Sequence, residues 1–182
     1  MKPSGEGRFE FAHDLIRQAT YRGLSQPRRR LIHRQIARAL DAAAGDDNAL
    51  AGELAFHAGA AGEHVLAVKA SIAAGEHCLR IFANIAAMDA ADRGLGHLQQ
   101  LPPGPERARA HIGLLKVKVY AVASPRIRAK PKLFDEIQDA VRTAELMGLL
   151  EDEARLGWHA ISSLRQQQQR LARRAACHPA GG

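Results

Sequence analysis

The feature that most constrains the fold is a series of apolar segments with helical periodicity, each ended by glycine or proline. Gly62 follows an alanine-rich segment, and Pro102 to Pro105 form a run that no helix continues through. Between these breaks the apolar residues recur every three or four positions, which predicts amphipathic helices. We expect helices over these ranges: 49–60, 63–81, 85–101, 106–122, 133–149 and a last one from about 151 to 165.

Composition decides what packs between these helices. Hydrophobic residues make up 46% of the chain but aromatic residues only 4%, so the core must come from Ala, Leu, Ile and Val. This favours close helix packing over a β-sandwich. The candidate core residues are Val65, Leu66, Val68, Ile72, Leu79, Ile81, Leu133, Ile137, Val141, Ala144, Leu146 or Met147, and, in the last helix, Leu156, Trp158 and Ile161.

The helices pair into hairpins of similar size, which suggests an all-α, tetratricopeptide-like superhelical array of antiparallel hairpins. If Pro102 is set at the closing proline of such a repeat, Ala90 falls at a small-residue contact and Cys78 at a tolerated one. Gly94 falls where a bulky aromatic is usual, so the repeat is degenerate. Lysines and valines alternate over 116–119, which leaves some strand character in that segment.

The N-terminal region has a different pattern. We expect residues 1–8 to be poorly ordered, a short strand at Phe9 to Phe11, and a helix from His13 to about Gly23. A second helix should begin at Ser25, which can cap it, with Pro27 in the first turn, and run to about Ala43. At 100° per residue its packed side would carry Ile32, Ile36, Ala39 and Leu40, and its basic side Arg30, His33, Arg34 and Arg38.

Charge is unevenly distributed along the chain. Residues 1–40 contain nine Lys and Arg against three Asp and Glu, and residues 41–101 contain three against eight. The candidate interaction residues are therefore arginines of the second helix: Arg28, Arg29, Arg30, Arg34 and Arg38. They could contact DNA phosphates, contact an acidic neighbouring domain, or form a solvated face. No aromatic residue lies among them, which argues against stacking on single strands.

The motifs that would carry catalysis are not in the sequence. There is no GxxxxGK[ST] phosphate loop, no HExxH and no GxSxG. The nine histidines form no i, i+4 pair with a neighbouring carboxylate, and Cys78 has apolar neighbours, so we interpret these residues as packing or surface groups. We predict no catalytic, cofactor-binding or metal-binding residue, and a chain that is not an enzyme. An enzyme with a hidden His/Glu site is the least favoured alternative.

Residues 9–40 resemble a known family. Several positions carry the likeness: Phe11, His13, Leu15, Ile16 and Arg17, then Tyr21, the arginine run, Leu31 with His33, and Ile36 to Leu40. Together they resemble the segment that follows the nucleotide-binding module in STAND-type bacterial transcriptional regulators. These include LuxR-type large ATP-binding regulators, maltose-regulator-like proteins and regulators with a bacterial transcriptional activator domain. Phrases at Ala74 to Glu76 and Leu101 to Arg107 continue the likeness.

The resemblance implies an ATPase module before Phe9 and a DNA-binding effector elsewhere, and neither is in this sequence. It implies that residues 1–45 end a winged-helix region, that 46–165 form the helical array, and that 166–182 are a disordered basic tail. The expected function is a non-catalytic regulatory or sensor scaffold that binds a protein partner, the neighbouring ATPase domain or a small-molecule inducer. The alternative is a stand-alone basic nucleic-acid-binding helical protein. No run is apolar enough for a membrane span and no secretory signal precedes Phe9, so we predict a cytoplasmic protein without a membrane partner.

Overall fold

The structure, a computed structural model, describes residues 2–4, 8–10, 14–44, 48–122 and 131–149 together with residue 169. Its elements in chain order are β1 (Lys2–Ser4), β2 (Arg8–Glu10), α1 (Asp14–Gly23), α2 (Gln26–Ala43), α3 (Ala51–Ala61), α4 (His64–Arg80), α5 (Asn84–Leu98), α6 (Pro105–Val122) and α7 (Pro131–Leu146). The predicted last helix over 151–165 lies outside the described residues. So does the predicted tail over 166–182, apart from residue 169.

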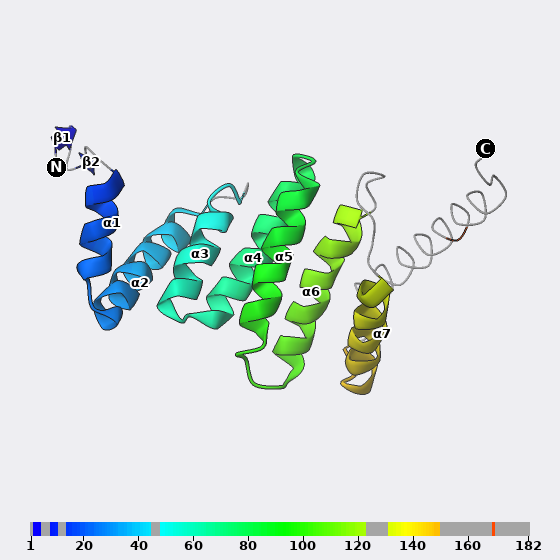
Figure 1. Cartoon of the computed structure of the whole chain (residues 1–182). Helices are drawn as coiled ribbons and strands as arrows, with labels where there is room; N and C mark the ends of the chain where they lie inside the picture. Colours follow the sequence, from blue (N-terminus) through cyan, green and yellow to red (C-terminus); the bar gives the residue numbers. More distant parts are fainter. Residues whose placement is uncertain are drawn as a thin grey trace, which may run out of the picture.

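The helices form a single row (Figure 1), and the predicted all-α class is confirmed. From α2 to α7 each helix packs on the next in sequence, and α4 also reaches α6. Short turns at 62–63 and 81–83 reverse the chain direction between α3 and α4 and between α4 and α5. Contacts between near neighbours only are typical of a quasi-one-dimensional helical array. Helix α2 packs directly on the helices that follow it, because Ala37 of α2 shares a core cluster with Leu54 of α3 and Ala67 of α4.

Proline and glycine set the helix boundaries by local chemistry. Pro27 lies in the first turn of α2, where a missing N–H costs no hydrogen bond. Ser25 is the N-cap of α2, as predicted, but its side chain makes no capping hydrogen bond. Gly62 ends α3 in the left-handed region at φ 82°, which is easily reached without a Cβ. The segment over 116–119 is helical, because it belongs to α6.

Small residues let the central helices approach closely. A Cβ added to Gly75 of α4 would lie 2.6 Å from Cγ1 of Val117 on α6. A Cβ added to Gly94 of α5 would overlap Leu114 of α6 and lie 2.9 Å from Cβ of Ser71 on α4. Leu114 and Val117 therefore fill the space that larger side chains on α4 and α5 would need. A residue larger than glycine at position 94 would collide with Leu114 and Ser71.

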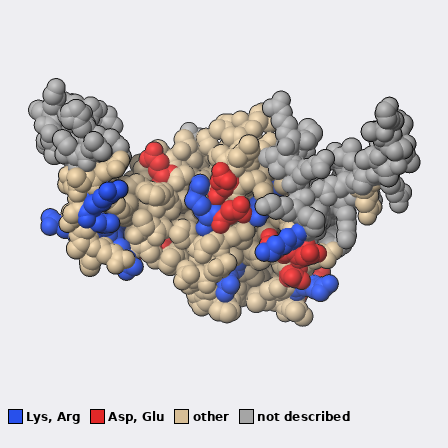
Figure 2. Space-filling model, in the orientation of Figure 1, with Lys and Arg blue, Asp and Glu red and all other residues tan. Residues whose placement is uncertain are grey.

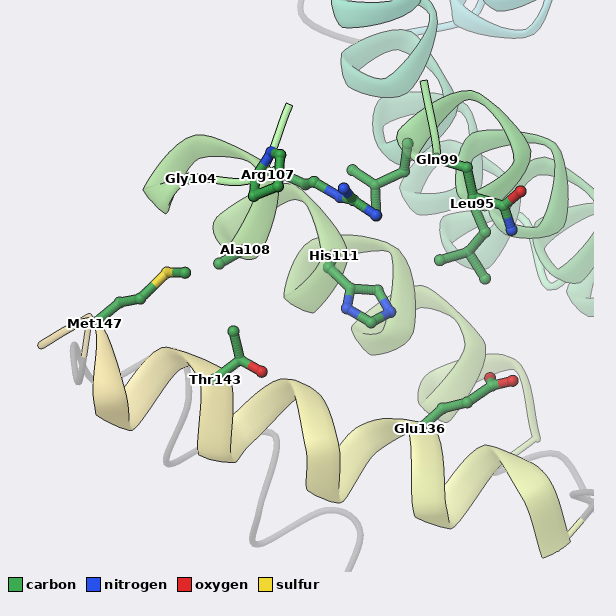
Figure 3. A pocket seen from close by; sticks show the side chains of 11 residues that line it. Leu95, Gln99, Gly104, Arg107, Ala108, His111, Glu136, Thr143 and Met147 are labelled. Carbon is green, nitrogen blue, oxygen red and sulfur yellow. The ribbon is translucent and has the colours of Figure 1, made fainter. Parts of the chain in front are cut away.

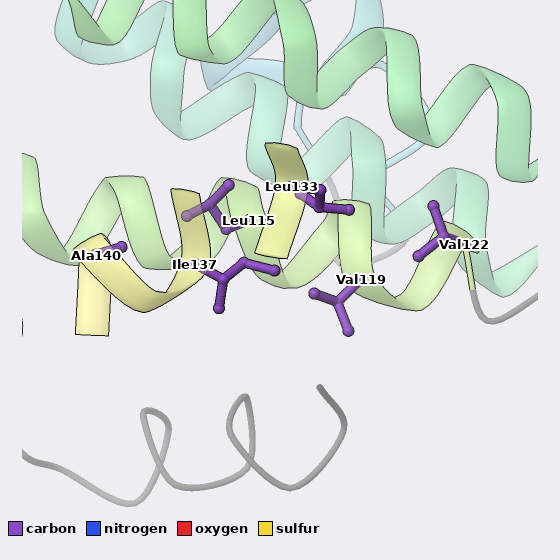
Figure 4. Close-up of a cluster of buried hydrophobic side chains, with 6 residues drawn as sticks. All are labelled: Leu115, Val119, Val122, Leu133, Ile137 and Ala140. Carbon is purple, nitrogen blue, oxygen red and sulfur yellow. The ribbon is translucent and has the colours of Figure 1, made fainter. Parts of the chain in front are cut away.

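The core continues to the end of the described array. Between α6 and α7 the buried side chains are Leu115, Val119, Val122, Leu133, Ile137 and Ala140 (Figure 4). In α7, Leu133, Ile137 and Ala144 are buried as predicted, whereas Leu146 is 90% exposed. This cluster joins α7 to the array through apolar burial, the dominant stabilising term in folding.

Several predicted positions were wrong. Val65 and Ile81 were expected in the core but are exposed. Val65 lies on the side of α4 opposite its buried residues, and Ile81 lies beyond the last residue of α4. Ala39 was expected on the packed side of α2 and is exposed. Lys2–Ser4 was expected to be poorly ordered but forms β1, which pairs antiparallel with β2.

Candidate interaction surface on helix α2

Helix α2 has one packed side and one exposed side, as its sequence pattern predicts. Its buried residues are His33 and Ala37, and Ile32, Ile36 and Leu40 are half-buried around them. Arg30, Arg34 and Arg38 lie four residues apart on the opposite side, and all three are exposed. Basic side chains gather over α1 and α2 at one end of the molecule (Figure 2). The structure therefore presents three of the five predicted arginines as one stripe.

Arg29 is separate from this stripe. Its guanidinium donates from Nε to the carbonyl of Leu24 at 3.0 Å and from Nη2 to the carbonyl of Arg22 at 2.6 Å. It also lies over the ring of Tyr21, with Cζ 4.9 Å from the centroid. Carbonyls at a helix C-terminus have no partner within the helix, so these bonds satisfy the end of α1. Arg29 thus links the end of α1 to α2.

Arg34 is paired as well. Its Nε lies 2.7 Å from Oε1 of Glu63, the N-cap residue of α4, and the two side chains are 46% and 39% exposed. Such surface pairs contribute roughly 0–1 kcal/mol, so a partner could exchange with Glu63 at little cost. In the described part of the chain, Arg28, Arg30 and Arg38 form no ion pair, and all three are exposed.

An apolar depression lies between these arginines. Gln26, Pro27, Arg30, Leu31 and Arg34 line a shallow cavity of about 330 Å³. Leu31 is 53% exposed, although it is a large aliphatic residue in the middle of a helix. We call the set Arg28, Arg30, Leu31, Arg34 and Arg38 the α2 surface. It combines positive charge with an apolar centre, a combination that suits a protein partner better than a bare phosphate chain.

The sequence prediction placed His33 on the exposed basic side of α2, and this prediction was wrong. His33 is only 6% exposed and joins three helices. Its Nε2 is hydrogen-bonded to the hydroxyl of Tyr21 on α1 at 2.8 Å, and its Nδ1 to Nδ1 of His57 on α3 at 2.9 Å. A polar side chain can lie on the buried side of a helix when both of its polar atoms have partners. Periodicity alone could not reveal those partners, because they come from other helices.

Aromatic and imidazole rings pack around His33 where α1, α2 and α3 meet. Phe56 of α3 contacts it edge-to-face, with centroids 5.7 Å apart, and Phe56 also packs edge-to-face on His57 at 5.2 Å. Burial, and then the positive charge that His33 could carry, lower the pKa of His57, whereas Glu53 raises it. The lowered pKa favours the neutral form of His57, and in the contact between the two Nδ1 atoms one nitrogen donates and the other accepts.

The other histidines do not assemble into a reactive centre in the ranges that the structure describes. His64 at the start of α4 and His97 near the end of α5 face each other with Nδ1 atoms 3.3 Å apart. Burial and His64 lower the pKa of His97. Among the described residues, no three His, Cys, Asp or Glu side chains are arranged to hold a metal ion. Cys78 is a free thiol, half-buried beside the α5–α6 core.

None of the helices in the described ranges combines the length and the apolar character needed to cross a bilayer. Comparison of the chain with protein-family models, with curated proteins and with solved structures finds no match. The functional argument therefore starts from the geometry of the α2 surface.

Proposed function

We propose that this chain is the non-catalytic regulatory array of a STAND-type transcriptional regulator, and that the α2 surface docks the neighbouring ATPase module. The observation that carries the proposal is the division of α2. One side is buried against α3, and the other presents Arg30 and Arg34 around an exposed Leu31. A surface with an apolar centre and a charged rim matches the usual anatomy of a protein interface.

The shape of the chain supports a relay. A row of helices that contact only near neighbours can transmit a small shift from one end to the other through its packed interfaces. The α2 surface lies near one end of that row, and Arg29 and His33 connect α1 to α2 and α3. Tetratricopeptide-like hairpins would give such an array. Ala90, which the repeat alignment assigns to a small-residue contact, is only 2% exposed, and this supports the proposal.

The nucleic-acid alternative makes a different prediction. Arginines that bind duplex DNA release counterions, so affinity falls with salt at a slope of about −0.9 for each phosphate neutralised. The three unpaired arginines would give a slope of roughly −3. Leu31 has no role in such a contact, so DNA binding should be indifferent to a polar residue there.

The test begins with the coding sequence upstream of Met1. An in-frame phosphate-loop module there would be expressed separately, and its affinity would be measured for the wild-type chain and for the variants Arg30→Glu and Leu31→Asn. We expect Leu31→Asn, at the apolar centre, to weaken association at least about tenfold. Arg30→Glu should weaken it as well, because it reverses a charge at the rim. Arg93→Glu, an exposed arginine on α5, is the matched control and should leave association unchanged.

Two outcomes decide against the proposal. One is an upstream region without such a module, and the other is a module that binds wild type and Arg30→Glu equally. Salt-dependent duplex binding that is lost in Arg30→Glu but kept in Leu31→Asn, which is polar and uncharged, would establish the nucleic-acid alternative instead.

A further inference from the structure

A second cavity lies at the other end of the array, between the end of α5, the turn at 99–104, α6 and α7. Its volume is about 450 Å³, within the range of small-molecule sites. The apolar part of its wall consists of Leu95 and Leu98 of α5, Ala108 of α6 and Met147 after α7. Figure 3 shows Leu95, Ala108 and Met147 around the cavity. The polar part of the wall consists of Gln99, Arg107, His111, Glu136 and Thr143.

The two charged groups of the cavity come from different helices. Arg107 on α6 is half-buried, and its Nη1 donates to the carbonyl of Leu101 at 3.0 Å. This bond holds the guanidinium in place and leaves its other N–H groups for a ligand. Among the residues that the structure describes, the ionic partner of Glu136 on α7 is Lys132, at 3.6 Å, and Lys132 is 84% exposed. That pair is weak, so an ammonium group in the cavity could replace it.

His111 adds no second cation at neutral pH. Its ring extends from α6 toward α7 between these two charges (Figure 3). Burial lowers its pKa, Glu136 raises it, and Arg107 lowers it again, with a net decrease from 6.5. The imidazole is therefore neutral near pH 7 and offers one donor and one acceptor. The cavity carries one fixed positive and one negative group.

This arrangement selects for ligand charge. Glu136 would repel a ligand with only a negative charge, and Arg107 would repel a ligand with only a positive charge. A neutral apolar molecule would leave both groups without a new partner. Removing a charged group from water without such a partner is costly. A molecule with charges of both signs satisfies both groups.

We propose that this cavity binds a small zwitterion, a molecule with one carboxylate and one ammonium group joined by an apolar chain. The carboxylate would bind Arg107, with Gln99 beside it, and the ammonium would bind Glu136. The apolar chain would lie along the ring of His111, which Figure 3 shows between the two charged groups. The proposal deepens the proposed function, because it names the chemical class of the small-molecule inducer, and it depends on that function only for its regulatory meaning.

Titration calorimetry with the full chain tests the site with simple probes. The ω-amino acids β-alanine, γ-aminobutyrate and ε-aminocaproate place the two charges at increasing separation. Caproate and hexylamine each lack one charge. We expect one length in the series to bind best, and ε-aminocaproate to bind at least about tenfold more tightly than caproate or hexylamine.

Variants assign each charge to its residue. Arg107→Gln should remove the advantage of ε-aminocaproate over hexylamine, and Glu136→Gln its advantage over caproate. Arg109→Gln on α6 and Glu145→Gln on α7 change the same residue types at exposed positions outside the cavity and should not alter binding. Far-UV circular dichroism confirms that each variant is folded.

Failure has a clear form. The proposal is overturned if no probe binds at millimolar concentration, if caproate binds as well as ε-aminocaproate, or if Arg107→Gln and Glu136→Gln leave these preferences unchanged. The α2 surface is not involved in these measurements. A failed zwitterion site and a failed docking surface are therefore distinguishable.

Discussion

Gly94 provides the sharpest test of how the central helices pack. Replacing it with alanine adds one methyl group that would overlap Leu114, which is fully buried, and lie 2.9 Å from Cβ of Ser71. Leu114 cannot move into solvent, and Cβ of Ser71 is fixed by the α4 backbone, so the helices must separate. Overpacking of this kind costs about 1–3 kcal/mol.

Helix propensity works in the other direction, so a control is required. Alanine is favoured over glycine inside a helix by roughly 1 kcal/mol, which reduces the net cost of Gly94→Ala to about 0–2 kcal/mol. Gly96 lies two residues further along α5, is exposed, and has no atom within 4 Å of an added Cβ. Gly96→Ala should therefore raise the free energy of unfolding by up to about 1 kcal/mol.

The quantity that tests the packing is the difference between the two variants. We expect Gly94→Ala to be less stable than Gly96→Ala by about 1–3 kcal/mol, measured from urea unfolding followed by far-UV circular dichroism. Thermal midpoints should differ by roughly 2–12 °C in the same direction. Leu114→Ala should reduce the difference, because it removes the atoms that the new methyl group meets. Equal stability of the two glycine variants would refute the close approach of α4, α5 and α6.

Two further predictions concern the α1–α2 joint and the histidines. Arg29→Gln should lower the free energy of unfolding by about 1–2 kcal/mol, because it removes hydrogen bonds to two carbonyls and the contact with Tyr21, whereas Arg28→Gln should change it by less than about 0.5 kcal/mol. Urea midpoints of the two variants give the comparison, and equal effects would contradict the capping role. The pKa of His97 is below its ordinary 6.5 in the folded chain, so below that pH the unfolded chain binds more protons and stability falls as pH decreases. Unfolding followed from about pH 7.5 to 5.5 should show this loss, with a smaller slope in His97→Asn; an unchanged slope would mean that His97 does not titrate between the two states.

Much of the secondary structure was predictable because its signals are local. Pro27 lies in the first turn of α2, Gly62 ends α3 and Pro105 begins α6, each through its own backbone chemistry. The basic stripe at Arg30, Arg34 and Arg38 was predictable too, because residues four apart lie on one side of a helix wherever that helix packs.

The partners of individual side chains were not predictable from the sequence. Arg29 belonged to the same arginine run as Arg30, yet it binds the end of α1, and His33 is buried between Tyr21 and His57. The only sequence signal for this joint was a tyrosine, a histidine and an aromatic–histidine pair on successive helices. Such a signal carries no geometry until the helices are placed.

By itself, the sequence determined that the chain folds into helices and where most of the central ones begin and end, because helix periodicity and the restrictions of proline and glycine act within a few residues. Tertiary structure decided which polar residues are buried and which helices enclose a cavity. Arg107 and Glu136 are 29 positions apart and lie on different helices, and only the packing of α7 on α6 brings them to one cavity. Burial and charge pairing depend on such distant neighbours, so no local pattern encodes them.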